Sequence, residues 1–314
     1  MTPQPIISSE DAPPVAPPPP PESLLRVAWR RIYSNWVSMT CVCIVGLYVL
    51  AGLAALTPTM DRLITQPVGG VYDAPRWGSP SVWLGTDIQG QSVFWRTIYG
   101  ARVALVLVVI TSILSLGIGT ILGTVAGYFG GWIDVLIVWL FTTISSIPWL
   151  LLVLALAYVL SSRPALAERF DGLPVIIIAL GLTDWVGLCR LLRGEVLKHR
   201  ERDYVVSARA AGAGDGRIIF RHILPNVAHL IIITFSLSAV SYVQAEVVLT
   251  FVGLGISGKP SWGRMIDDAR LELLRGVWWQ IAAATIAIFV LCLALNILGD
   301  DLRDALDPRL RNVS

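Results

Sequence analysis

Six long runs of apolar residues limit how this 314-residue chain can fold more than any other feature of its sequence. Each run is continuous and does not alternate between apolar and polar residues, which favours helices over the strands of a barrel. A helix needs about 20 apolar residues to cross the hydrocarbon core of a bilayer, so the runs predict six transmembrane helices. They are residues 37–56, 103–128, 135–160, 173–188, 223–256 and 277–299.

The composition agrees with an all-α integral membrane protein. Hydrophobic residues make up 55% of the chain and charged residues 15%, whereas an average soluble domain is about 25% charged. The formal net charge of +2 is too small to indicate nucleic-acid binding. Pro148 lies inside the third run and is expected to kink or break that helix, because proline lacks the backbone N–H.

The distribution of Lys and Arg predicts the orientation of the helices. Segment 190–222 contains eight of these residues, whereas ten are spread over three segments on the other side that are together more than twice as long. Short cytoplasmic loops of membrane proteins carry the excess of Lys and Arg. Both termini and segment 190–222 are therefore predicted to lie in the cytoplasm.

The chain divides into four predicted regions. Residues 11–22 contain seven prolines in twelve positions, a composition that favours solvated polyproline II over a packed core. The regions are a disordered, Pro-rich cytoplasmic tail (1–22), the first transmembrane helix with an external loop (23–102), a core transmembrane domain (103–299) that contains cytoplasmic loop 190–222, and a cytoplasmic C-terminal tail (300–314).

No catalytic or metal-binding pattern stands out in the sequence. The three histidines and four cysteines do not have the spacing of a metal site. GLGISGKP, residues 253–260, comes close to a phosphate-binding loop, but Pro260 stands where the hydroxyl that binds Mg²⁺ is required. A predicted membrane helix also precedes it, where that loop needs a strand. We expect no catalytic residue, metal or cofactor in this chain.

The second apolar run carries small residues at a regular spacing. Ser115, Gly119, Gly123 and Gly127 are each four residues apart and so line one face of a helix. Small side chains on such a face let the backbone of another helix approach closely. We expect this face to be a helix-packing seam.

The stretch ARAAGAGDGRIIFRHILPN, residues 208–226, interrupts the apolar pattern. Glycine costs about 1 kcal/mol per helix position relative to alanine, so its three closely spaced glycines predict a break between two helices. Asp215 is expected to cap the second helix by accepting backbone N–H bonds. Pro225 is expected where the chain re-enters the bilayer. The resulting helix, turn and helix would project from the cytoplasmic face and suit insertion into a groove on a partner.

This stretch resembles the "EAA" cytoplasmic loop of ATP-binding-cassette (ABC) importer permeases. In that family a glycine is followed thirteen residues later by a proline, with leucine directly before the proline. Gly212, Leu224 and Pro225 match this pattern. The initial Glu of the family's loop is replaced by Val206 and its Ile by His222, which removes any salt bridge that the Glu would make but leaves the shape of the loop.

Three further stretches resemble the permeases of oligopeptide, dipeptide and nickel importers. WLGTDIQGQSVFWRTIYGARVAL, residues 83–105, is similar to their segment with LGTD and YGAR, with Gln91 and Ser92 in place of the usual Arg-Asp. Residues 261–274 and 278–311 look like the C-terminal part of the second, C-type permease subunit. The resemblance covers nearly the whole chain after the Pro-rich tail.

The resemblance implies a type I ABC importer permease in the cytoplasmic (inner) membrane of a bacterium. A homologous second permease subunit would complete the pathway, an external solute-binding protein would deliver the substrate, and two ATPase subunits would carry ATP and Mg²⁺. Peptides are favoured over nickel as the substrate. The residues assigned to ATPase coupling are Ser207, Ala208, Arg209, Ala210, Ala211, Gly212, Ala213, Gly214, Asp215, Leu224 and Pro225.

Two acids lie within the predicted membrane helices. Asp184 and Glu246 are candidates for function, because a charged residue in the bilayer is costly. Each either lines the pathway or makes helix–helix hydrogen bonds, and Asp184 could also pair with a basic residue such as Arg190.

Three alternatives to a peptide importer stay open. The same kind of importer could carry nickel or another small solute. An ion-coupled secondary transporter acting alone would need inverted repeats and a chain of buried acids or histidines, whereas this sequence has two isolated acids. A membrane-embedded enzyme is the least favoured, because no metal or nucleophile pattern supports it.

Overall fold

The computed structural model describes residues 33–162, 172–256 and 258–306, and these residues form helices joined by loops. The helices that make up the membrane spans are α2 (Trp36–Ala54), α4 (Val93–Phe129), α5 (Gly131–Ser145), α6 (Trp149–Ser161), α8 (Leu173–Gly181), α9 (Trp185–Arg200), α12 (Leu224–Phe251) and α14 (Trp279–Leu306). The shorter elements are α3 (Pro58–Thr65), α10 (Asp203–Ala210), α11 (Asp215–Ile218), α13 (Trp262–Glu272), two 3₁₀ turns (Pro80–Val82 and Leu273–Arg275) and a π-helical turn (Ile219–Ile223).

The number of predicted membrane segments is confirmed. Five helical segments of the described chain are long and apolar enough to cross a membrane, and the pair α5–α6 gives a sixth if it is counted as one span. The axes of α5 and α6 differ by 90° across a short break. Pro148 stands at this break as the N-cap of α6, as the sequence predicted.

Helices α4 and α14 extend well beyond the predicted membrane segments. Helix α4 begins at Val93 rather than at residue 103, because the Ser92 hydroxyl accepts a hydrogen bond from the backbone N–H of Trp95 at 3.4 Å and caps the helix. The end of the external loop is thus part of a membrane helix. Helix α14 runs to Leu306, so the first residues of the predicted C-terminal tail are helical. The Pro-rich tail (1–22) and residues 307–314 lie outside the described part of the chain.

Helices α4 and α9 pack closely along the predicted seam of small residues. A Cβ atom on Gly123 would lie 2.6 Å from the carbonyl oxygen of Cys189. A Cβ on Gly119 or Gly127 would similarly lie 2.8 Å from a carbonyl oxygen of α9. Only glycine permits this approach, which confirms the packing seam.

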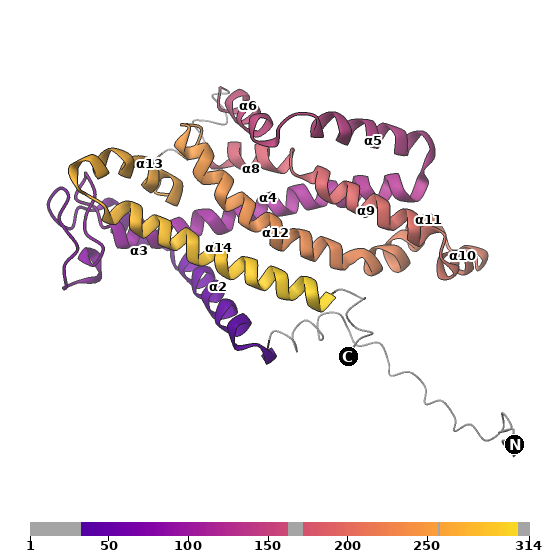
Figure 1. The fold of residues 1–314 in the computed structure, drawn as a ribbon, viewed down its shortest axis with the longest axis horizontal. Helices are drawn as coiled ribbons and strands as arrows, with labels where there is room; N and C mark the ends of the chain where they lie inside the picture. Colours follow the sequence, from indigo (N-terminus) through magenta and orange to yellow (C-terminus); the bar gives the residue numbers. More distant parts are fainter. Residues whose placement is uncertain (1–32, 163–171, 257, 307–314) are drawn as a thin grey trace, which may run out of the picture.

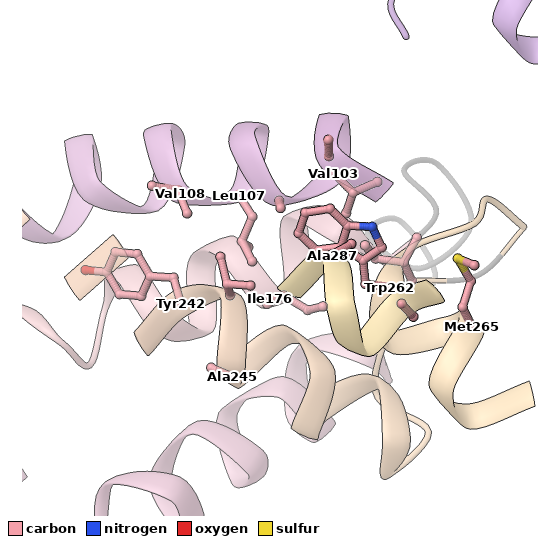
Figure 2. Packing of buried hydrophobic residues seen from close by; sticks show 14 of the residues in the cluster. Val103, Leu107, Val108, Ile176, Tyr242, Ala245, Trp262, Met265 and Ala287 are labelled. Carbon is pink, nitrogen blue, oxygen red and sulfur yellow. The ribbon is translucent and has the colours of Figure 1, made fainter. Parts of the chain in front are cut away.

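The largest buried cluster joins seven helices around the first half of α4. It includes Leu107 of α4, Ile176 of α8, Tyr242 of α12, Trp262 of α13 and Ala287 of α14, as Figure 2 shows. The Trp262 indole N–H donates to the carbonyl oxygen of Thr97 at 2.9 Å. This polar anchor satisfies the indole N–H inside an apolar core and fixes α13 on α4.

The two ends of the helical body carry different structures. Helices α3 and α13 lie at one end together with the loop that precedes α4, and α10 and α11 project at the opposite end (Figure 1). The basic stretch 208–226 and the segment 83–105, which contains the LGTD motif, therefore lie on opposite sides of the predicted membrane. The two sides can therefore serve different partners.

Candidate functional site

The interrupted stretch forms a helix, a tight turn and a second helix at the projecting end of the molecule (Figure 1). The backbone N–H of Gly212 donates to the Arg209 carbonyl, and that of Ala213 donates to the Ala208 carbonyl, both at 3.0 Å. Gly212 has φ of +84°. This pair of bonds around a left-handed glycine is a Schellman motif, which ends α10 and reverses the chain without leaving its last carbonyls unpaired.

The turn is tied to the end of α4 by a tyrosine that sequence reasoning did not single out. The buried Tyr128 donates a hydrogen bond to the Asp215 carboxylate at 2.6 Å and accepts a longer one of 3.4 Å from Arg209. This bond raises the pKa of the Arg209 guanidinium. Arg200, at the end of α9, donates to the Tyr128 carbonyl oxygen at 3.2 Å. Tyr128 therefore connects both sides of the turn to a membrane helix.

The predicted capping role of Asp215 is wrong. Gly214 is the N-cap of α11, and its position has no side-chain cap bond. Asp215 is the first residue of the helix, where its negative charge interacts favourably with the free N–H groups of the first turn. Its side chain instead accepts from Tyr128, because that hydroxyl is the buried donor that most needs an acceptor.

An apolar layer supports the turn from beneath. Val205, Ile218, Ile219 and Ile223 are buried together with Tyr128. Val206 and Phe220 point the other way, with exposed fractions of 52% and 75%. They lie on either side of an exposed tip formed mostly by small residues. The tip thus presents two apolar side chains beside a rigid turn, which is a surface suited to a protein partner.

Leu224 and Pro225 lie in the first turn of α12, after the π-helical turn. The backbone N–H of Leu224 reaches back to the carbonyl of Ile219. In a regular helix the proline ring would clash with the carbonyl four residues earlier, and the wider π-helical turn leaves room for the ring. The helix consequently runs on from Asp215 to Phe251 as one span, and the tip is mechanically continuous with the membrane helix.

The basic residues of the loop fall into two groups. Arg193 pairs with Asp134 of α5, with the Nη2–Oδ2 distance at 2.7 Å, and Arg190 donates to the Ser145 hydroxyl at 3.0 Å. These two hold α5 against α9. Three exposed arginines have no acidic partner within salt-bridge distance among the described residues, and they remain available to a partner. They are Arg202, Arg217 and Arg221.

Asp184 lies in an irregular turn between α8 and α9, which together form one membrane span, and the sequence did not reveal this turn. Its carboxylate accepts hydrogen bonds from the Tyr242 hydroxyl at 2.7 Å and the Ser238 hydroxyl at 3.2 Å, both on α12. The considered pairing with Arg190 does not occur, because that side chain turns to α5. Asp184 also lines a cavity of about 340 Å³ together with Pro148 of the α5–α6 break. The α5–α6 break and this turn of the α8–α9 span therefore meet at a membrane acid, and a discontinuous helix beside such a residue is typical of transport sites.

Glu246 has a different environment from Asp184. Only 4% of this residue is exposed, and the Thr250 hydroxyl donates to its Oε1 at 3.0 Å. A Cβ atom on Gly263 would lie 2.9 Å from the same oxygen. Glu246 is thus enclosed between α12 and the first turn of α13, which favours the packing role over the pathway role.

These features define a class of protein. It is a helical membrane protein that has a helix break beside an acid in the membrane, and a tight turn at one end that suits contact with a partner protein. Comparison with known proteins supports this class. The profile of the family described as "Binding-protein-dependent transport system inner membrane component" matches residues 119–312.

Curated relatives extend the similarity over most of the chain. The dipeptide transport system permease protein DppC of Bacillus subtilis is 37% identical over 290 residues, which cover 90% of this chain and 85% of the relative. The oligopeptide permease protein OppC of the same species is 33% identical, covering 92% and 91%. The glutathione permease protein GsiD of Pectobacterium atrosepticum is 32% identical, covering 92% and 93%.

The chain therefore belongs to the binding-protein-dependent transport system inner membrane components. It is the membrane-spanning permease subunit of an ABC importer, has the type I importer permease fold, and is located in the inner membrane. Members of the family are transporter subunits, so the chain is not an enzyme.

Proposed function

We propose that this chain forms, with a homologous second permease, the pathway for di- or oligopeptides. An external binding protein delivers the peptide, and two ATPase subunits that bind ATP and Mg²⁺ drive transport from the cytoplasm. The names of the relatives support a peptide, because they are dipeptide, oligopeptide and glutathione permeases. The excess of basic residues in segment 190–222 supports the cytoplasmic side for the loop.

The segment Ser207–Asp215 with Leu224 and Pro225 is the proposed coupling element. The observation that carries this proposal is the Schellman turn at Gly212, which Tyr128 ties to α4 and which runs on into α12. A stiff turn linked to two membrane helices transmits a push from an ATPase subunit to the pathway. The exposed apolar residues beside the turn, Val206 and Phe220, provide the contact surface.

Asp184 is the proposed pathway acid and Glu246 the proposed packing acid. Asp184 stands at the cavity that the α5–α6 break shares with the irregular turn between α8 and α9. Its bonds to Ser238 and Tyr242 connect that cavity to α12, the helix that continues from the coupling element. Movement of α12 would therefore change the surroundings of Asp184, which gives the loop a route to the pathway.

The substitution Gly212→Trp tests the coupling role. No atom lies within 4 Å of a Cβ built on Gly212, but its φ of +84° disfavours any other residue, and a large ring would alter the contact surface. We expect normal insertion in the membrane and a loss of peptide uptake of at least tenfold in proteoliposomes that contain the whole importer.

Gly253→Trp is the matched control for this experiment. Gly253 has φ of +86° and equally open space around a Cβ, but it follows α12 at the opposite end of the molecule. Uptake should be close to that of the parent importer. Normal uptake by the Gly212→Trp importer at normal expression would count against the coupling role.

A further inference from the structure

A large cavity lined by many charged residues lies at the end of the molecule opposite the coupling loop. Its volume is about 970 Å³, and it is lined by residues of α3, the loop before α4, the start of α4, the loop before α13, α13, the 3₁₀ turn after it and the start of α14. Ligand pockets for small molecules typically have volumes of about 300–1,000 Å³. Ten charged residues line it, namely Asp61, Asp87, Arg96, Lys259, Arg264, Asp267, Asp268, Arg270, Glu272 and Arg275.

Most of these charges neutralise one another. Arg96 pairs with the buried Asp87 and lies 3.7 Å from Asp268. Arg264 approaches Asp268 at 3.1 Å, and Arg270 approaches Asp267 at 3.4 Å. These pairs build the walls of the cavity and need no ligand.

Glu272 is the buried charged residue of this cavity that forms no ion pair among the described residues. Only 3% of the residue is exposed, and its Oε2 has no hydrogen-bond partner in the described part of the chain. No cation lies within salt-bridge distance of it there. Gln280 is fully buried beside the same cavity, and its Oε1 also lacks a partner. Two buried acceptors without donors are costly, because each forfeits the hydrogen bonds that water would provide.

The surroundings of Glu272 disfavour the charged form of its carboxyl, as expected for a buried acid that lacks a cationic partner. Burial raises the pKa of the Glu272 carboxyl, and the neighbouring Asp268 raises it further. Arg96 and Arg275 oppose this rise at longer range, and a backbone hydrogen bond from Ile88 to the carboxyl opposes it as well. A cationic group against Oε2 would remove the cost of this buried charge.

The exposed part of the cavity carries the opposite charge. Lys259 and Arg275 are exposed lining residues without an acidic partner within salt-bridge distance among the described residues. Arg275 instead lies over the ring of Tyr72, 5.8 Å from its centroid. Asp61, also exposed, is the remaining unpaired charge. The cavity therefore has a buried anionic position and cations near its mouth.

We propose that this external cavity binds a short zwitterionic peptide, with its terminal ammonium against Glu272 and Gln280 and its carboxylate near Lys259 and Arg275. The inference rests on the proposed peptide function and adds a receiving site on the permease itself. An ammonium provides three N–H donors for the unpartnered oxygens. No three His, Cys, Asp or Glu side chains of the described residues are arranged to hold a metal ion, so the acceptors suit an organic cation.

The test measures peptide binding to the whole permease and ATPase complex in lipid nanodiscs, without the external binding protein. Saturation-transfer NMR would compare trialanine, N-acetyl-trialanine and trialanine amide. We expect trialanine to bind, and acetylation to weaken binding at least tenfold because it removes the ammonium. This comparison uses the unmodified complex and does not depend on any variant folding. Equal affinities for the free and acetylated peptides would overturn the proposal, as would no binding of trialanine.

Variants then assign the two ends of the peptide. Glu272→Gln should weaken trialanine binding at least tenfold without changing the binding of N-acetyl-trialanine. Lys259→Gln should weaken trialanine but not its amide. Asp300→Asn and Arg76→Gln, which change exposed charges away from the cavity, are the matched controls and should bind like the parent. Unchanged trialanine affinity in a stably folded Glu272→Gln complex would contradict the assignment.

Two further measurements identify the occupant of the cavity and the substrate of the importer. A cationic side chain of the binding protein could occupy the same position as the peptide ammonium. If Glu272→Gln weakened docking of the peptide-free binding protein tenfold, the cavity would belong to that protein and our proposal would be wrong. Trialanine uptake by the complete importer without binding in this cavity would overturn only the receiving site. Absence of any di- or tripeptide uptake would contradict the proposed function itself.

Discussion

At the scale of single residues, Tyr128 is the side chain on which the coupling loop depends most. It lies at the end of α4, yet its hydroxyl bonds to Asp215 and Arg209, both in the loop. The sequence could not reveal this link, because Tyr128 and Asp215 are 87 residues apart. Gly212 and Pro225 were predictable from local chemistry, since a reversed turn needs glycine and a re-entering helix tolerates proline in its first turn. Leu224 was predicted only by the resemblance to the family's cytoplasmic loop.

Replacing Tyr128 by Phe should loosen the loop without unfolding the protein. The ring stays in its apolar layer, while the hydroxyl bond to a charged acceptor, worth about 1.5–3 kcal/mol, is lost. We expect peptide transported per ATP hydrolysed to fall severalfold in the reconstituted importer. Tyr158→Phe, an exposed tyrosine on α6, is the control. An unchanged ratio of transport to hydrolysis in Tyr128→Phe would show that the bond does not matter for coupling.

The two membrane acids should respond differently to neutral replacements. Asp184→Asn keeps an oxygen for the Tyr242 hydroxyl but removes the charge beside the cavity, so we expect normal assembly and uptake reduced at least fivefold. Glu246→Gln alters the enclosed contact between α12 and α13, so we expect a lower melting temperature with normal uptake per folded complex. Uptake and thermal melting of both variants are the measurements. The reverse pattern would exchange their proposed roles.

At the scale of the elements, the apolar runs predicted the membrane helices because length and hydrophobicity are local properties. The break at Pro148 was predictable for the same reason. The irregular turn before α9 was not, because Leu182, Thr183 and Asp184 contain neither proline nor glycine. The irregularity there is slight, because the backbone N–H groups of Leu182 and Asp184 still bond to carbonyls four residues back, and it places the Asp184 carboxylate against Tyr242 of α12.

The seam between α4 and α9 gives a stability prediction. In Gly123→Val the new Cβ would lie 2.6 Å from a backbone carbonyl of α9, so the two helices must separate. Overpacking of this kind typically costs about 1–3 kcal/mol, and we expect a lower melting temperature and less assembled importer. Gly117→Val, on the same helix but with nothing within 4 Å of its Cβ, is the control. Equal melting temperatures for the two variants would contradict close packing at the seam.

At the scale of the whole molecule, the two ends of one helical body serve different tasks. The end with α10 and α11 presents a stiff turn with exposed apolar residues, while the end with α3 and α13 encloses a charged cavity (Figure 1). Helices α4 and α12 run between them, so a movement at one end can reach the other. Sequence reasoning recognised both ends by resemblance, but the cavity depends on residues from many separate elements and became visible only in the structure.

The measurement that tests the central claim most directly is co-purification of the protein with its partners from native membranes. The chain would carry an affinity tag at its C-terminus and be extracted in a mild detergent shown not to separate membrane complexes. We predict that a second permease and one or two kinds of ATPase subunit travel with it, and that the Gly212→Trp chain loses ATPase subunits. A lone chain or a homodimer without any ATPase would contradict the account and favour a secondary transporter centred on Asp184.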